Sequence, residues 1–273
     1  MANSYPIGEF DPETLAEIPG NLSLTAMTGA GKTLLIIDWL SKIHKKFDSI
    51  YVFSRTAKIQ KCYNFIPREN ITDHFDEELL TKLFALHKSK KEANIDAELP
   101  KVLLIFDDVV NDLAYKRSKI FDNLFTEGRH YNFSSWFLTQ KFTLLKPLQR
   151  VNVRWAVAFD LDTKKEREYF CQDYLSAHNN QVGEMLFKRI VKERKYQAVI
   201  VEIYKNGESV DQKVKKYVAD PNVKAFKIKK NPPLIQFKFQ GLEDLTLRTR
   251  IRTPTDDPEV EVVLRRARAK KTF

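Results

Sequence analysis

Short apolar runs alternate with longer amphipathic stretches along most of the chain. Each apolar run suits one buried strand, and apolar positions three or four residues apart predict helices between the runs. The predicted strands are 21–25, 49–54, 101–106, 133–138, 153–159 and 196–203. The predicted helices are 32–46, 76–91, 112–128, 164–175 and 181–195. This alternation predicts an α/β fold with a mostly parallel sheet flanked by helices on both faces.

The pattern changes near residue 205, where lysines become frequent. Residues 213–238 contain eight lysines and a single acidic residue, Asp220. The final stretch, "RRARAKKTF", has five basic residues in nine and no acid. We therefore predict a core domain over residues 1–220 and a basic C-terminal extension over residues 221–273.

Composition narrows the class of protein. The chain has 273 residues, 43% of them hydrophobic, which is enough for a sizeable core and argues against general disorder. A net charge of +10 favours polyanionic partners such as nucleic acid. The cysteines, Cys62 and Cys171, lack metal-binding spacing, and a zinc pattern is absent. With no leader and no apolar run long enough for a membrane span, we expect a soluble, non-secreted protein.

The stretch "AMTGAGKT" lies between the first predicted strand and the first predicted helix. A glycine-rich turn in this position places backbone N–H groups around a phosphate, which predicts a P-loop. Lys32 would reach the β- and γ-phosphates of ATP, and the Thr33 hydroxyl would bind Mg²⁺. The small side chain of Ala26, where the pattern GxxxxGK[ST] has glycine, still lets the loop close. The alternative is an ordinary strand-to-helix turn. The predicted nucleotide-binding residues are Ala26, Met27, Thr28, Gly29, Ala30, Gly31, Lys32 and Thr33.

Polar residues end two later strands. "VLLIFDD" closes on Asp107, which we assign to the metal, and Asp108, which we assign as the base that polarises water. "NFSSWFLTQ" closes on Gln140, which can sense the γ-phosphate or orient water. Taken singly, Asp108 could be a solvated strand end and Gln140 a loop residue. In this order they indicate a P-loop ATPase with an additional strand between the first two.

Three arginines near the later predicted strands are candidates for a contact between subunits of a ring. Arg129 lies in "EGRHYNF", and Arg150 and Arg154 lie in "PLQRVNVRW". In ring ATPases an arginine of the neighbouring subunit stabilises the γ-phosphate charge in the transition state. We favour Arg129 for this role and Arg150 after it; the alternative for either is a surface ion pair.

Five stretches together resemble the poxvirus-like genome-packaging ATPases of the FtsK–HerA superfamily, over roughly residues 8–220. They are "AMTGAGKT", "YVFSRTAKIQKCYNFIP", "VLLIFDDVV", "GRHYNFSSWFLTQ" and "LQRVNVRWAVAF". The resemblance implies a RecA-like core, a homo-oligomeric ring of five or six subunits, and ATP-driven translocation of double-stranded DNA into a preformed capsid. It also implies a location in the host cytoplasm, at the virus assembly site or in the virion. Lys32, Thr33, Asp107, Asp108 and Gln140 carry over as ATPase residues.

The basic residues fit a motor that grips duplex phosphates without reading bases. Residues 213–238 and 265–271 are candidates for that grip, or for docking on an acidic capsid vertex or portal; a solvated tail is the alternative. Two other functions stay open: another FtsK–HerA-type DNA pump or filament-assembly ATPase, and a nucleotide-gated DNA-binding protein without motor activity. The lack of a membrane span disfavours a membrane-anchored pump. Intact Lys32, Asp107 and Asp108 disfavour the non-catalytic protein.

Overall fold

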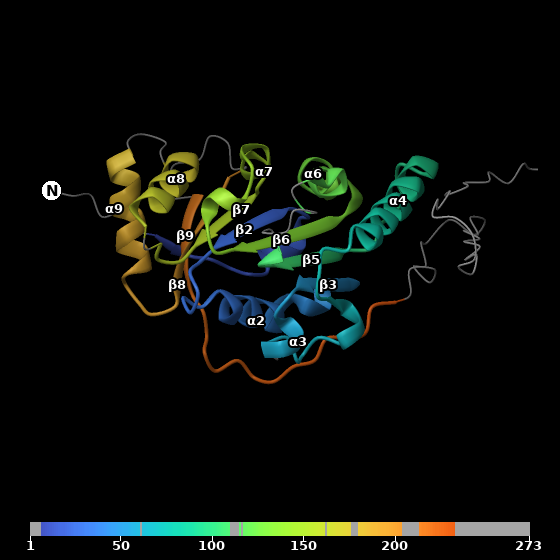
Figure 1. The fold of residues 1–273 in the computed structure, drawn as a ribbon, viewed down its shortest axis with the longest axis horizontal. Helices are drawn as coiled ribbons and strands as arrows, with labels where there is room; N and C mark the ends of the chain where they lie inside the picture. The colour runs from blue at the N-terminus through green and yellow to red at the C-terminus, as the bar shows by residue number, and fades with distance from the viewer. Residues whose placement is uncertain are drawn as a thin grey trace, which may run out of the picture.

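A mostly parallel β-sheet runs through the molecule, as the computed structural model shows (Figure 1). The structure describes residues 7–60, 62–109, 115, 117–161, 163–175, 180–203 and 213–232. Within them the sheet has nine strands in the order β1-β9-β8-β7-β2-β6-β5-β3-β4. All pairs are parallel except those of β8 with β7 and β9. The strands are β1 (Gly8–Glu9), β2 (Asn21–Thr25), β3 (Ser49–Ser54), β4 (Ile71–Thr72), β5 (Val102–Asp107), β6 (Phe133–Thr139), β7 (Trp155–Ala158), β8 (Gln197–Glu202) and β9 (Val214–Val218).

Helices cover both faces of the sheet, with α2 and α3 on one side and α4, α6, α7, α8 and α9 on the other (Figure 1). Their bounds are α1 (Thr14–Glu17), α2 (Lys32–Ile43), α3 (Ala57–Gln60), α4 (Glu77–Ala93), α6 (Lys119–Thr126), α7 (Pro147–Val151), α8 (Lys164–Tyr174) and α9 (Asn180–Val191). Short 3₁₀ turns are η1 (His44–Lys46), η2 (Arg68–Asn70), η4 (Gly128–Tyr131) and η5 (Phe142–Leu144). No helix among the described residues is long and apolar enough to cross a bilayer.

The sheet divides the core into two hydrophobic clusters. Alternate residues of β5 enter different clusters: Val102, Leu104 and Phe106 pack on the side of α4 and α6, and Leu103 and Ile105 on the side of α2. All five side chains are fully buried. A strand covered on both faces reads as a continuous apolar run, and this explains the run "VLLIF" in the sequence.

The predicted α/β class is confirmed, and each of the six predicted strands is present with small shifts at its ends. Three further strands, β1, β4 and β9, were not predicted. β1 and β4 have two residues each, and β9 reads VKKYV, so none carries a clear apolar alternation. The predicted helix 112–128 corresponds in its second half to α6, whereas residues 110–114 lie outside the described residues.

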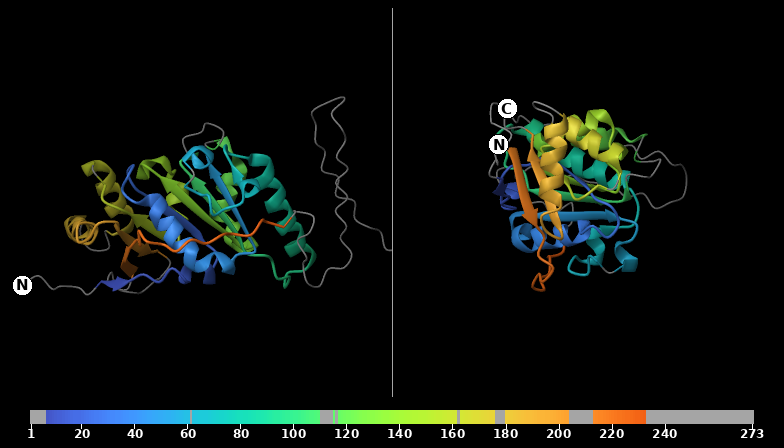
Figure 2. Two further views of the ribbon diagram at one scale, coloured as in Figure 1. Left: turned by 90° about the horizontal axis from the view of Figure 1, so that it is seen from below. Right: turned by 90° about the vertical axis from the view of Figure 1, so that its left-hand side faces the viewer.

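After β9 the chain crosses the face of the molecule that carries α2 and α3 (orange in Figure 2). We call residues 219–232 the C-terminal strap. The Ile228 N–H donates to the Phe65 carbonyl at 2.8 Å. The Asn231 side chain accepts from the Ile50 N–H at 2.9 Å and donates to the Ile50 carbonyl at 2.8 Å, as a neighbouring strand would. The strap is therefore hydrogen-bonded to the core at several places along its length.

The predicted division into a core (1–220) and a basic extension (221–273) stays a prediction. Residues 221–232 belong to the strap and contact the core. Residues 233–273, which include the candidate DNA contacts Lys238 and 265–271, lie outside the described residues.

Candidate nucleotide site

The predicted ATPase residues meet at the carboxyl ends of three parallel strands. β6 lies between β2 and β5, so the additional strand expected from the sequence separates the P-loop strand from the strand with the acids. Thr25 at the end of β2 is in register with Thr139 at the end of β6, and Asp107 at the end of β5 is in register with Leu138. Because ligands of open α/β sheets bind outside the carboxyl ends of the strands, this edge is where a site is expected.

The P-loop connects β2 to α2 with two residues in the left-handed backbone region. Gly29 has φ 80° and Gly31 has φ 109°, conformations that favour glycine over any residue with a Cβ. Gly31 is also the N-cap of α2 and accepts a hydrogen bond from the Leu35 N–H at 2.9 Å. The N–H groups of the first helical turn are therefore available to an anion.

Ala26 begins this loop without strain, although the strict pattern has glycine there. Its side chain is fully buried in the core cluster beneath α2, and its N–H donates to the Thr139 carbonyl at 3.0 Å. It is not among the described non-glycine residues with positive φ. A Cβ is thus accommodated at this position. The next residues, Met27, Thr28 and Gly29, are exposed at the sheet edge.

Lys32 points from the start of α2 towards both acids. Its Nζ donates to Asp108 Oδ1 at 2.8 Å and lies 3.7 Å from Asp107 Oδ1. The Lys32 side chain is only 10% exposed, so the two carboxylates compensate a largely buried ammonium. Thr33 follows on the helix and is partly exposed. The structure thus brings Lys32 and the paired acids together, with Thr33 next to Lys32 on the same helix.

Asp108 is turned towards solvent by an unusual backbone conformation. Its φ is 54°, in the left-handed region that aspartate adopts more readily than most side chains. The Asp108 N–H donates to the Leu138 carbonyl at 3.1 Å, which ties the turn to β6. Gln140 completes the contact by donating from Nε2 to Asp108 Oδ2 at 3.1 Å. Both Asp108 oxygens are thus hydrogen-bonded, one by Lys32 and one by Gln140, the residue that follows β6.

Asp107 is buried and faces inward. Burial raises the pKa of its carboxyl, and the Lys32 charge opposes part of that rise. Its Oδ2 accepts a hydrogen bond from the Tyr63 hydroxyl at 2.8 Å, whereas Oδ1 has no hydrogen-bond partner within the described structure. Tyr63 was not predicted as a site residue. The only signal in the sequence was its place in the stretch "YVFSRTAKIQKCYNFIP".

Of the two candidate arginines, Arg129 lies away from this edge. Arg129 is exposed in η4, immediately before β6, and the Asn132 carbonyl that follows accepts from the Val102 N–H at the start of β5. It is therefore at the amino ends of these strands. Since β6 has seven residues at about 3.3 Å each, roughly 20 Å separates Arg129 from Gln140.

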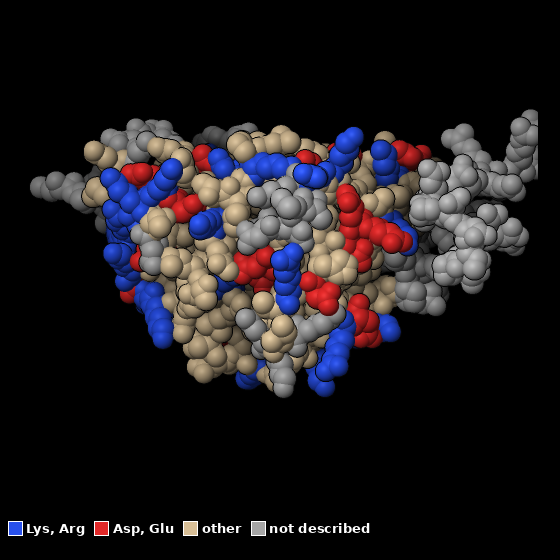
Figure 3. All heavy atoms as spheres, viewed as in Figure 1, with Lys and Arg blue, Asp and Glu red and all other residues tan. Residues whose placement is uncertain are grey.

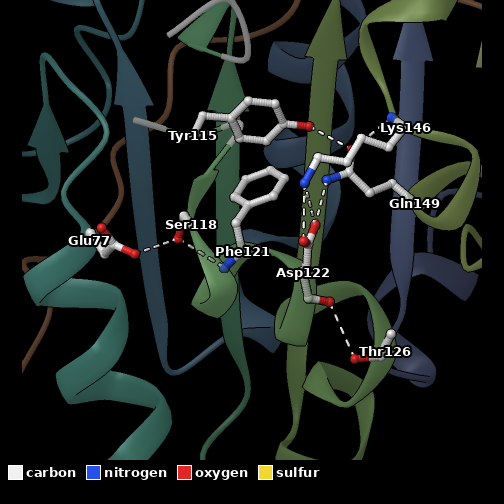
Figure 4. A network of polar contacts seen from close by, with 8 residues as sticks. All are labelled: Glu77, Tyr115, Ser118, Phe121, Asp122, Thr126, Lys146 and Gln149. Carbon is white, nitrogen blue, oxygen red and sulfur yellow. Dashed lines mark hydrogen bonds and ion pairs between the residues drawn. The ribbon is translucent and has the colours of Figure 1, made fainter. Parts of the chain in front are cut away.

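Arg150 is held by partners within its own chain. In α7, its Nε donates to Asp173 at 2.8 Å, its Nη1 donates to the Leu145 carbonyl at 3.0 Å, and its guanidinium lies over the Phe142 ring. The neighbouring residue, Gln149, is fully buried and donates to Asp122 of α6 at 2.9 Å, next to the Lys146 ammonium (Figure 4). This network fixes α7 against α6.

Residues 7–238 match the model of the poxvirus A32 protein family. The chain belongs to this family. Its similarity to two curated relatives agrees: it is 26% identical over 165 residues to the DNA packaging protein OPG160 of Vaccinia virus, strain Copenhagen, and 25% identical over 168 residues to that of Monkeypox virus. The matches cover 58% and 59% of this chain and 60% and 54% of the relatives. The chain therefore matches only part of the length of each relative.

Solved structures agree with this fold. The genome packaging NTPase B204 of Sulfolobus turreted icosahedral virus 2, in complex with AMP, superposes with a TM-score of 0.50 at 16% identity, covering 76% of this chain and 98% of B204. The pCW3 conjugation coupling protein TcpA, with ATPgS, gives 0.53 at 12% identity, covering 75% of this chain and 61% of TcpA. At sequence identities of 16% and 12%, the similarity to these two structures shows a shared fold and nothing more.

The P-loop geometry predicts that its two left-handed glycines differ in their tolerance of a side chain. A Cβ at Gly31 would lie 2.8 Å from the Tyr196 ring, whereas a Cβ at Gly29 would meet nothing within 4 Å. Both Gly→Ala changes should cost about 1–2 kcal/mol for the left-handed backbone, and Gly31→Ala about 1–3 kcal/mol more for the overlap. Urea unfolding of the ligand-free variants measures the difference. Equal losses at the two positions would contradict the packing of Tyr196 on Gly31.

Proposed function

We propose that this chain is an ATP-hydrolysing motor that moves double-stranded DNA into a preformed viral capsid. The observation that carries the ATPase proposal is the convergence of Lys32, Asp107, Asp108 and Gln140 beside an anion-binding loop. The packaging proposal rests on the family and on curated relatives named as DNA packaging proteins. The names of these relatives also support the proposal that the protein acts at the virus assembly site in the host cytoplasm.

Lys32 and the loop N–H groups would bind the β- and γ-phosphates of ATP. Mg²⁺ fits Thr33 and Asp107, because Asp107 Oδ1 is a buried carboxylate oxygen with no hydrogen-bond donor in the described structure. Hard oxygen ligands of this kind, hydroxyl and carboxylate, suit Mg²⁺. When bound, the ion would neutralise negative charge that develops on the phosphates.

Asp108 and Gln140 would act on the attacking water. Asp108 is the more accessible acid, with its side chain 30% exposed against 7% for Asp107. With a phosphate bound, Lys32 would have a further anionic partner besides the two carboxylates, so Asp108 Oδ1 could instead accept the water proton. Gln140 holds the other oxygen, Oδ2, and would keep the carboxylate oriented during that step.

A neighbouring subunit would supply the arginine. Arg129 is exposed and lies at the amino ends of the strands, so it cannot reach the γ-phosphate of its own subunit across roughly 20 Å of strand. A ring in which the amino edge of one subunit faces the carboxyl edge of the next would bring the two together. Arg150 is the second candidate, although it would have to leave three intramolecular contacts.

Duplex DNA would be held through its phosphates by exposed basic residues. In the strap, Phe226, Ile228 and Asn231 face the core, whereas the lysines between and beside them are exposed. The exposed strap lysines are Lys224, Lys227, Lys229 and Lys230.

A second group of basic residues gathers at the end of the molecule that carries α9 (Figure 3). Exposed basic residues of α9 and the following turn are Lys188, Arg189, Lys192, Arg194 and Lys195. We propose that one or both groups contact DNA, and that an acidic capsid vertex or portal is a further partner.

The first test of the function is ATP hydrolysis with and without duplex DNA. Lys32→Ala should lower turnover by at least about a hundredfold and weaken ATP binding, since the phosphates lose their point charge. Asp108→Asn should still bind Mg·ATP but hydrolyse it at least about a hundredfold more slowly. The control is Lys45→Ala, which removes an exposed lysine beyond the far end of α2. Near-normal turnover by Lys32→Ala would refute the proposed ATPase site. If the rate of ATP hydrolysis by the wild-type protein is the same with and without duplex DNA, the proposed motor function is refuted.

The DNA proposal can be tested on the strap lysines. Reversing Lys227, Lys229 and Lys230 to Glu should weaken duplex binding for all sequences alike, and reduce the slope of log affinity against log salt by about one per lost phosphate contact. The matched control reverses Lys82, Lys88 and Lys91, which lie on α4 on the other face of the sheet. Fluorescence anisotropy over a salt series measures both quantities. If the two triple variants bind equally, the strap is not the DNA contact.

The ring can be tested by mixing inactive subunits. Arg129→Ala should bind ATP normally and hydrolyse it slowly. A Lys32→Ala subunit still offers its Arg129 to a neighbour, so mixed rings should contain interfaces with both groups intact. Because an arginine finger is worth about a thousandfold or more in rate, even a few such interfaces should raise activity above background.

The control for that experiment mixes Lys32→Ala with Asp108→Asn. These residues bond each other within one subunit, so no interface regains a complete site and activity should stay low. Size-exclusion chromatography with duplex present checks that mixed oligomers form. Mixed oligomers without recovered hydrolysis would exclude Arg129, and Arg150→Ala would then be examined in its place.

A further inference from the structure

We propose that Tyr63 is a positioning residue that fixes the orientation of the Asp107 carboxylate towards the metal ion of the nucleotide site. The inference rests on the proposed ATPase function and deepens it. Tyr63 lies after β3, the strand next to β5, so its ring reaches Asp107 from the neighbouring strand end.

The two Asp107 oxygens have different surroundings. Oδ2 accepts the Tyr63 hydroxyl at 2.8 Å, in a contact between two buried side chains. Oδ1 accepts no hydrogen bond in the described structure and lies 3.7 Å from the Lys32 ammonium, which is too long for a hydrogen bond. The protein therefore satisfies one oxygen and leaves the other directed towards the residue that would bind the phosphates.

A carboxylate without such a partner would not stay in one orientation. The terminal torsion of aspartate is broad, so the carboxylate plane of Asp107 could rotate to other angles if the Tyr63 hydroxyl were absent. A hydrogen bond to one oxygen removes that freedom before the ion arrives. Partners of this kind behind a metal ligand typically change metal affinity by about 10- to 100-fold.

Tyr63 is itself held from two directions. Its carbonyl accepts the Ile66 N–H at 2.9 Å, which closes the turn that follows it. Two residues along, the Phe65 carbonyl accepts the Ile228 N–H of the strap, and the Phe65 and Phe226 rings lie 4.5 Å apart. The segment that carries Tyr63 is thus fixed between the strap and the carboxyl edge, and this suits a residue that must hold another side chain still.

Tyr115 offers a matched control. It is also fully buried, and its hydroxyl donates to Gln149 Oε1 at 2.7 Å, on the α6 and α7 side of the sheet (Figure 4). Tyr63→Phe and Tyr115→Phe each delete one buried hydroxyl and its hydrogen bond without changing the ring. They should therefore lower the unfolding temperature to a similar degree, but only Tyr63→Phe removes a contact to Asp107.

The experiment measures Mn²⁺ affinity by electron paramagnetic resonance, with a non-hydrolysable ATP analogue bound and well below each variant's unfolding temperature. Tyr63→Phe should weaken Mn²⁺ binding by about tenfold or more, whereas Tyr115→Phe should stay near the wild type. Affinity for the analogue in EDTA should be the same in all three proteins, because Tyr63 does not contact the phosphates. Asp107→Asn is the positive control for loss of the ligand.

Two results would overturn the inference in distinguishable ways. If Tyr63→Phe matches Tyr115→Phe in Mn²⁺ affinity while the wild type binds Mn²⁺ and analogue together, Tyr63 has only a structural role and the ATPase proposal stands. If the wild-type protein binds neither the analogue nor Mn²⁺ with it, the nucleotide site itself is wrong, and the role of Tyr63 is wrong with it.

Discussion

The contact of Lys32 with two carboxylates is the interaction on which the carboxyl edge of the sheet depends. A largely buried ammonium is costly unless it is paired, and Asp108 at 2.8 Å and Asp107 at 3.7 Å supply the pairing. The dependence is mutual, because without Lys32 the charges of two adjacent acids, one of them buried, would repel each other without compensation. The P-loop, the end of β5 and the tip of β6 are thus held together by charge as well as by the sheet.

Strand order makes this contact possible. With β6 between β2 and β5, the acids are two strands away from the P-loop, and the long lysine side chain spans the end of the intervening strand. The same arrangement places Gln140 at that intervening tip, within reach of Asp108. If β2 and β5 were neighbours, there would be no strand tip between the P-loop and the acids to carry a residue that contacts Asp108.

Features encoded in short stretches of sequence were predictable, and contacts between distant segments were not. The P-loop, the paired acids and Gln140 each lie at the end of a strand. Each of these strands is predicted by an apolar run in the sequence. Tyr63 lies 44 residues from Asp107, and Asn231 lies 181 residues from Ile50. Neither contact has a local pattern, because it exists only after the strands pair. β9 was not predicted for a related reason. Its lysine-rich sequence does not indicate a strand, and it is a strand because it pairs with β8 and β1.

The distance between the amino and carboxyl ends of the strands explains why a second subunit would be needed to supply an arginine. In a parallel sheet every strand carries its amino end away from the site, so a residue before β6, such as Arg129, is separated from Gln140 by the full strand. Rotating a side chain cannot close a gap of about 20 Å. Arg150 does not offer a way around this limit, because its partners and the buried Gln149 beside it fix α7 in place. We therefore propose that the arginine that completes this site comes from another molecule. Of the two arginines favoured on sequence grounds, Arg129 is the exposed one, and Arg150 is the one whose three intramolecular contacts hold it in its own subunit.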